Sequence, residues 1–105
     1  MAEPRTSETS SVFEIQREFG LSHSDFFRIF PRIEPHATRT GDRDMALAMD
    51  DGRTLRIALS AEMVRRLGAL KIPFIDITFR FFGWSVEQRA EFFKKFERAF
   101  QKGGG

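Results

Sequence analysis

The chain has 105 residues, a formal net charge of +2 and no cysteine, which excludes disulfides, thiolate metal sites and thiol catalysis. Its length and its balance of 41% hydrophobic and 30% charged residues predict one globular domain, and no segment has the basic excess of a nucleic-acid-binding tail. The N-terminal residues hold no apolar run typical of a secretory signal, and no stretch approaches the roughly 18 apolar residues of a membrane helix, so we expect a cytosolic protein without membrane contact.

Residues 1–11 are polar and predict a disordered tail, whereas residues 12–102 form the domain and the glycines at 103–105 a flexible end. Apolar and polar residues alternate from Val12 to Phe19, which predicts a strand with one apolar face. Arg17 falls on that apolar face, which places it near an edge of the sheet.

A short helix is expected next, with Ser22 as its N-cap and Asp25 three residues later in the capping-box position. Phe26, Ile29 and Phe30 then share one helical face. Pro31 predicts that the helix ends at Phe30, because the residue before a proline disfavours helical angles. The following residues, up to Gly41, predict a loop.

Alternation over 44–49 and 53–59 predicts a hairpin, and Asp51-Gly52 between the two strands is typical of a two-residue type I′ turn. Ser60 then predicts the cap of a brief helix over 61–67 that ends at Gly68, with an extended or irregular connection as the alternative. Pro73 indicates a strand edge or bulge. Residues 74–82 alternate regularly and predict a strand.

The last predicted helix begins at Ser85, with Gln88 in the capping-box position. Phenylalanine supplies 13 of the 14 aromatic residues, and four of them lie on one face of this helix at helical spacing. Tyrosine and tryptophan, which commonly anchor binding surfaces, are nearly absent. The phenylalanines are therefore interpreted as core.

The element order is β-α-β-β-(α)-β-α, which predicts a two-layer α+β fold with a four-stranded, mainly antiparallel sheet and helices packed on one face. If the helix over 61–67 forms, the first six elements match the ferredoxin-like βαββαβ order. The other face of the sheet would be open, and it would present Glu14, Gln16, Glu18, Arg56, Thr78 and Arg80.

No motif indicates a catalytic, metal or cofactor site. Ser22, His23 and Asp25 are the residue types of a hydrolase triad, but neighbouring positions at a helix start point about 100° apart and cannot line up. His36 is the other histidine, and no metal-ligand spacing joins it to His23. We therefore expect no catalytic residue, no metal and no cofactor.

Phe27, Phe74, Phe82 and Trp84 do not fit the inward pattern. Exposed together, they would form an apolar patch for a partner protein or a second copy of the chain; alternatively, they close the edges of the core. The leading hypothesis is a small non-enzymatic protein that acts by binding a macromolecule, most readily a protein.

Arg89 falls within the apolar face of the last helix, where two interpretations remain open. Its side chain either extends to solvent along Phe92, or it pairs with Asp76 or binds an anion together with Arg17. The alternative function is therefore an anion- or nucleic-acid-binding module using Arg17, Arg56, Arg80 and Arg89. RNA recognition by the open sheet face would need aromatic residues at strand centres, and only Phe74 and Phe82 point outward, at the strand ends.

Overall fold

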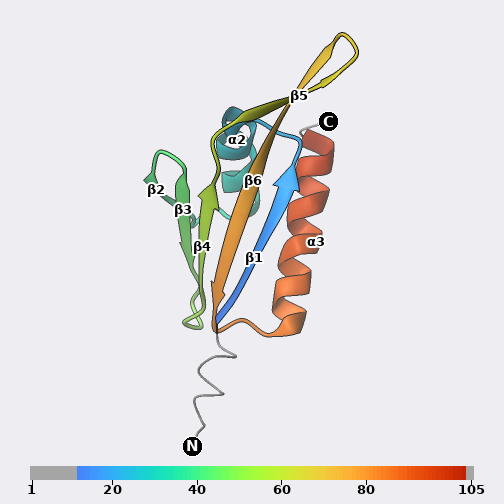
Figure 1. Ribbon diagram of the computed structural model, residues 1–105. Helices are drawn as coiled ribbons and strands as arrows, with labels where there is room; N and C mark the ends of the chain where they lie inside the picture. The colour runs from blue at the N-terminus through green and yellow to red at the C-terminus, as the bar shows by residue number, and fades with distance from the viewer. Residues whose placement is uncertain (1–11, 104–105) are drawn as a thin grey trace, which may run out of the picture.

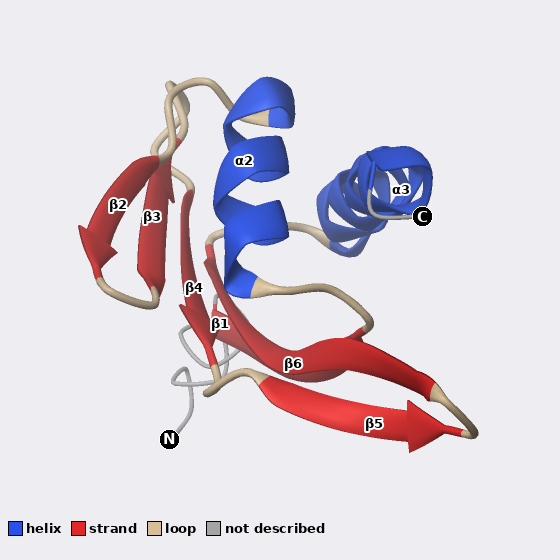
Figure 2. Cartoon of the chain, turned by 90° about the horizontal axis from the view of Figure 1, so that it is seen from above, coloured by secondary structure: helices blue, strands red, loops and turns tan. Residues whose placement is uncertain are grey.

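The computed structural model describes residues 12–103, which form two layers, a six-stranded sheet and two helices that lie on the same face of it (Figures 1 and 2). The predicted tail over 1–11 and the predicted flexible residues 104–105 lie outside the described residues. The elements are β1 (Val12–Phe19), α2 (His23–Ile33), β2 (Thr38–Gly41), β3 (Asp44–Ala48), β4 (Thr54–Leu59), β5 (Met63–Leu67), β6 (Leu70–Phe82) and α3 (Val86–Gly103).

The strand order is β1-β6-β4-β3-β2, with every neighbouring pair antiparallel, and β5 pairs with β6 beyond the end of the main sheet. The α+β class and the single-sided helices are confirmed, but four strands and the ferredoxin-like order are wrong. The prolines, threonines and glycine of the segment up to Gly41 predict a loop where β2 forms. β2 forms as an edge strand through backbone pairing with β3.

The segment 61–67 is not a helix. The extended alternative is what the structure shows, because β5 pairs with β6 in a hairpin whose two-residue turn is Gly68-Ala69. Gly68 has φ +63°, as the first position of a type II′ turn requires. β6 therefore begins at Leu70 and runs through Pro73, four residues earlier than the sequence predicted.

The β3–β4 hairpin is confirmed, but its turn is not type I′. Met49 and Arg53 are joined by a backbone hydrogen bond of 2.8 Å, and the Gly52 N–H donates to the Met49 carbonyl at 3.1 Å. Gly52 has φ +96°, and no non-glycine residue among 12–103 has positive φ. The loop is thus three residues long, with glycine at the left-handed position.

The core lies between the sheet and the helices. Every second residue of β6 is buried toward the helices, from Ile75 to Phe81. Three phenylalanines of α3, at positions 92, 93 and 96, pack onto this row. Phe96 is fully buried, and its ring centroid lies within 4.4–6.4 Å of six other phenylalanine rings. The predicted core role of the α3 phenylalanines is confirmed.

Two of the three predicted N-caps form, whereas Ser60 caps no helix and its hydroxyl instead accepts from the Asp76 N–H at 2.9 Å. The Ser22 hydroxyl accepts from the Asp25 N–H at 3.1 Å, and Ser85 and Gln88 form a reciprocal capping box. The predicted end of α2 is wrong, since the helix passes through Pro31 to Ile33. Ile33 packs against the core, and the Glu34 N–H donates to the Phe30 carbonyl at 3.0 Å, so helical hydrogen bonding continues past the proline.

Candidate functional site

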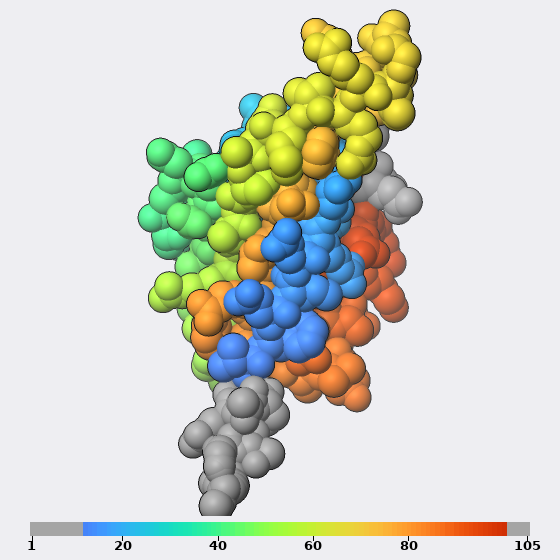
Figure 3. Space-filling view, in the orientation of Figure 1, coloured from blue at the N-terminus to red at the C-terminus, as the bar shows by residue number. Residues whose placement is uncertain are grey.

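The hairpin of β5 and the first part of β6, residues 63–74, projects from the body and is called the arm below (Figure 3). Residues 75–82 of β6 pair with β1 or β4, whereas residues 70–74 pair only with β5. Arg65 ties the base of the arm to the body, with its Nη1 atom 2.9 Å from Glu18 Oε2 and its guanidinium 4.5 Å from the Phe74 ring centroid.

The two faces of the arm differ in chemistry because side chains alternate along each strand. One face carries Arg65 and five apolar residues, and it continues the uncovered face of the main sheet. The opposite face carries the directly paired Arg66 and Lys71, with Val64 and Pro73. Val64 is 58% exposed, Leu67 55% and Leu70 64%, and no acidic residue occurs between 63 and 74.

The uncovered face of the main sheet is polar, as predicted. One row across it runs through Glu14, Arg80 and Arg56, and the Arg80 Nε atom lies 2.9 Å from Glu14 Oε1. Beside this row is a depression of about 410 Å³ lined by Thr40, Asp44, Met45, Arg56, Ile57, Ala58, Thr78 and Arg80.

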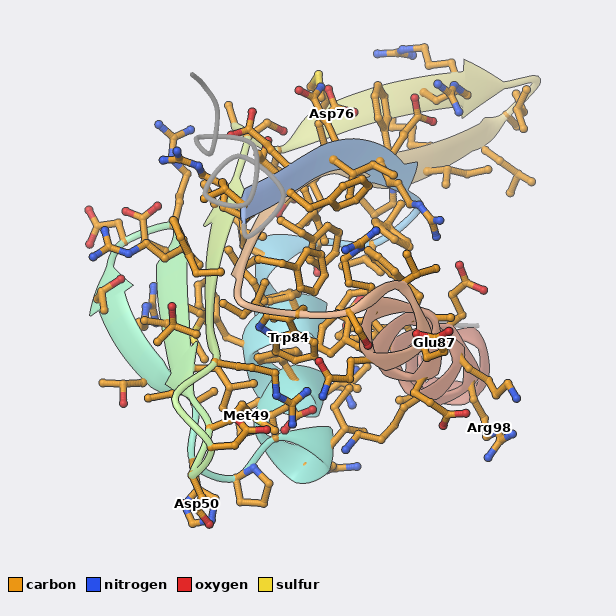
Figure 4. All side chains as sticks on the ribbon, turned by 90° about the horizontal axis from the view of Figure 1, so that it is seen from below. Met49, Asp50, Asp76, Trp84, Glu87 and Arg98 are labelled. Carbon is orange, nitrogen blue, oxygen red and sulfur yellow. The ribbon has the colours of Figure 1, made fainter. Side chains whose placement is uncertain are left out.

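A second hollow of about 370 Å³ lies at the N-terminal end of α3, beside Trp84 and Phe92. Figure 4 shows Trp84 between the ribbons of α2 and α3, with Asp50 at the periphery. The charged groups near the two rings are paired within the chain, since Arg53 stacks on Trp84 at 4.5 Å and Lys95 lies 3.3 Å from Glu34. Most of the charged side chains around this hollow thus already have a partner within the chain.

The four predicted interaction residues do not come together in one patch. Trp84 is 6% exposed, packs on Phe81 and Phe92, and donates its indole N–H to the Thr54 carbonyl at 2.8 Å. Phe74 and Phe82 are half-buried on the uncovered face, at the arm and at the other end of β6 respectively.

Phe27 is half-buried on the helix layer, where the Arg39 guanidinium lies 3.8 Å from its ring centroid. It is therefore separated by the sheet from Phe74 and Phe82. The structure thus distributes the four aromatic residues among the core, the two ends of β6 and the α2 surface.

The four predicted arginines divide into two pairs on opposite faces of the sheet. Arg17 and Arg89 lie on the helix side, where Arg17 stacks on Phe93 at 4.2 Å and Arg89 on Phe13 at 3.8 Å. Arg56 and Arg80 lie on the uncovered face.

Both helix-side guanidinium groups have partners. Arg17 Nη1 lies 2.7 Å from Glu97 Oε2, and Arg89 Nη1 donates to the Trp84 carbonyl at 3.2 Å. The predicted pairing of Arg89 with Asp76 does not form, because Asp76 lies on the other side of the sheet (Figure 4).

The two histidines have different surroundings. His23 Nε2 is 2.7 Å from the Ser60 carbonyl oxygen, and since a carbonyl only accepts, this nitrogen carries the proton. The His23 backbone N–H donates to Glu62 at 2.9 Å, whereas His36 is exposed. Within residues 12–103, no three histidine or acidic side chains are grouped as metal ligands would be.

Asp25, in the first turn of α2, has a pKa below its usual value. A hydrogen bond from Arg28, at 2.9 Å, lowers the pKa of Asp25 below its usual value, and the hydrogen bonds to Ser22 add to this effect. The arrangement stabilises the start of α2.

The exposed apolar residues of the arm, Val64, Leu67 and Leu70, were not predicted as interaction residues. The signal was present as alternation around Gly68, but Met63, Val64 and Leu67 also fit a helical face.

A family-model scan and searches of curated proteins and solved structures each give no significant match for this chain. Neither described helix is long and apolar enough to cross a membrane.

Proposed function

We propose that the chain is a cytosolic, non-enzymatic protein that acts by binding another protein through the arm. The observation that supports this proposal is the exposure of Val64, Leu67 and Leu70, each by more than half, on an arm attached to the body only at its base. An isolated two-stranded hairpin is at best marginally stable in water. A partner that covered the arm would remove these side chains from water. Full burial of each would make the free energy of binding more favourable by up to about 1.5–3 kcal/mol.

The chemistry of the arm favours a protein over a nucleic acid as partner. Nucleic-acid affinity grows with the number of phosphates that lysine and arginine neutralise. The arm has three basic side chains, and Arg65 is already paired with Glu18. Large exposed aliphatic side chains at the tip instead suit an apolar protein surface.

Site-specific photocrosslinking tests the proposal. A photoreactive phenylalanine analogue placed at Leu67 of the full chain is expected to give a defined covalent adduct in the cells of origin. The matched control carries the same analogue at Arg98, an exposed position on α3 away from the arm. The adduct from Leu67 should disappear when Val64 and Leu70 are replaced by serine, changes that are expected to leave the unfolding midpoint unchanged because both side chains are exposed.

The same crosslink in purified protein distinguishes the two kinds of protein partner. An adduct of twice the chain mass identifies a second copy, whereas an adduct seen only in cells identifies a different protein. Equal crosslinking from Leu67 and Arg98, or adducts that survive the serine replacements, would refute binding through the arm.

A further inference from the structure

Two arginines on neighbouring strands lie directly opposite each other on the uncovered face. Arg56 of β4 is in register with Arg80 of β6, and Glu14 of β1 is in register with Arg80 on its other side. Directly opposed side chains have Cβ atoms about 4.5–5.5 Å apart, where like charges destabilise a sheet. Glu14 pairs with Arg80, and within residues 12–103 Arg56 forms no ion pair. One carboxylate therefore faces two guanidinium groups in this row.

The row borders the 410 Å³ depression, which is within the size range of small-molecule sites. Ala58 is next along β4 on the same face as Arg56, and its small side chain leaves room beside the long arginines. Thr78 and Thr40 add hydroxyl groups to the lining, and Asp44 adds a carboxylate toward the β2 edge. The depression thus has a cationic side and, across it, one carboxylate.

We propose that this depression binds a small oxyanion, a phosphate or carboxylate group, in a ligand that also carries a hydrogen-bond donor. The anion lies against Arg56 and Arg80, whose guanidinium groups suit planar, two-point bonding to oxyanions, and the threonine hydroxyls donate to it. The donor group of the ligand, a hydroxyl or an ammonium, reaches Asp44. A bare anion binds less well, since it faces the Asp44 charge without compensating it.

The ligand class has two sources that share this chemistry. One is a free phosphorylated or carboxylated metabolite, and the other is a phosphorylated or acidic side chain of a protein. Extended nucleic acid is disfavoured, because the lining residues include no aromatic side chain on which bases could stack. The site lies in the main sheet and shares no lining residue with the arm.

Amide chemical shifts of the ¹⁵N-labelled full chain, titrated with O-phosphoserine, inorganic phosphate and serine at constant ionic strength, test the site. Saturable shifts confined to β2, β3, β4 and β6 are expected with O-phosphoserine, weaker binding with inorganic phosphate and no binding with serine. Arg56→Gln is expected to weaken O-phosphoserine binding about tenfold or more, as loss of a charged hydrogen-bond donor does. Arg98→Gln, an equal charge change on α3, is the matched control.

Asp44→Asn gives a second, opposite signature. It should strengthen the binding of inorganic phosphate while reducing the preference for O-phosphoserine. A short peptide with an internal phosphoserine separates the sources, since tighter binding than the free amino acid identifies a protein-borne group and weaker binding a metabolite. Shifts that do not saturate, or equal weakening by Arg56→Gln and Arg98→Gln, would overturn the proposal. Arg56 and Arg98 are both exposed, and the spectrum of each variant shows directly whether it is folded.

Discussion

Replacement of Phe96 by alanine is expected to remove a large part of the stability of the fold. The side chain is fully buried, and its ring has six phenylalanine neighbours, the nearest being Phe100 at 4.4 Å between centroids. Phenylalanine-to-alanine changes in cores cost about 3–5 kcal/mol, against a total stability of about 5–15 kcal/mol for a typical domain. With a urea m value of about 1.5 kcal/mol/M, the midpoint should fall by about 2–3 M.

Urea unfolding followed by circular dichroism and by the fluorescence of Trp84, the one tryptophan, measures this effect. Val86→Ala on the same helix is the control, because Val86 is 66% exposed and should change stability by no more than about 0.5 kcal/mol. Phe96→Leu should fall between the two and remains measurable if the alanine variant is unfolded. If Phe96→Ala costs less than about 1 kcal/mol, the assignment of this ring to the centre of the core is refuted.

Three further outcomes are expected from the same unfolding assay. Ser22→Ala should lower the free energy of unfolding by about 1 kcal/mol through loss of the α2 N-cap, and an unchanged midpoint would contradict the capping role. Gly52→Ala should cost about 1–2 kcal/mol, because nothing lies within 4 Å of the added Cβ and only the left-handed backbone is penalised; a neutral result would contradict that conformation. Asp25→Asn should destabilise at pH 7 and progressively less as the pH falls below about 3.8. The pKa of Asp25 is depressed in the fold, so its contribution is present above the ordinary value near 3.8 and is lost as the pH falls through the folded value. A penalty independent of pH would contradict the ion pair with Arg28.

Elements that bury one face could be predicted from the sequence. β4 and the body part of β6 show strict alternation, and α3 shows a helical phenylalanine stripe, because each presents apolar side chains to one core. β1 alternates except at Arg17, and its Ile15 and Phe19 pack partly buried against the same core. The N-caps were predictable for a related reason, since the serine hydroxyls at positions 22 and 85 satisfy backbone N–H groups that the helix leaves unpaired.

Elements that bury little could not be predicted in this way. β2 has no buried residue, so its pairing with β3 leaves no hydrophobic pattern in the sequence. The arm is similar, because residues 63–67 are exposed or half-buried and no core selects between helical and extended spacing. The turn at Gly68, which pairs β5 with β6, instead gives this segment its extended form.

The candidate sites show the same division. The outward position of Arg56 and Arg80 followed from alternation, and their direct opposition depends on strand register, which the sequence did not specify. Trp84 does not fit the inward pattern, and the sequence leaves open whether it is exposed or closes an edge of the core. The structure buries its ring against Phe81 and Phe92 and satisfies its N–H with a backbone carbonyl, which a linear pattern does not reveal.

The outer edge of β5 has a consequence for the behaviour of the protein in concentrated solution. An exposed strand with aliphatic side chains can template intermolecular β-pairing and aggregation. Arg65 and Arg66 interrupt the apolar residues of this strand, and Lys71 lies directly across from Arg66. Strands from two copies brought edge to edge would place these cations close together, so the charges act as gatekeepers against fibre formation. Because added salt screens such repulsion, these charges oppose edge-to-edge pairing of β5 most effectively at low ionic strength.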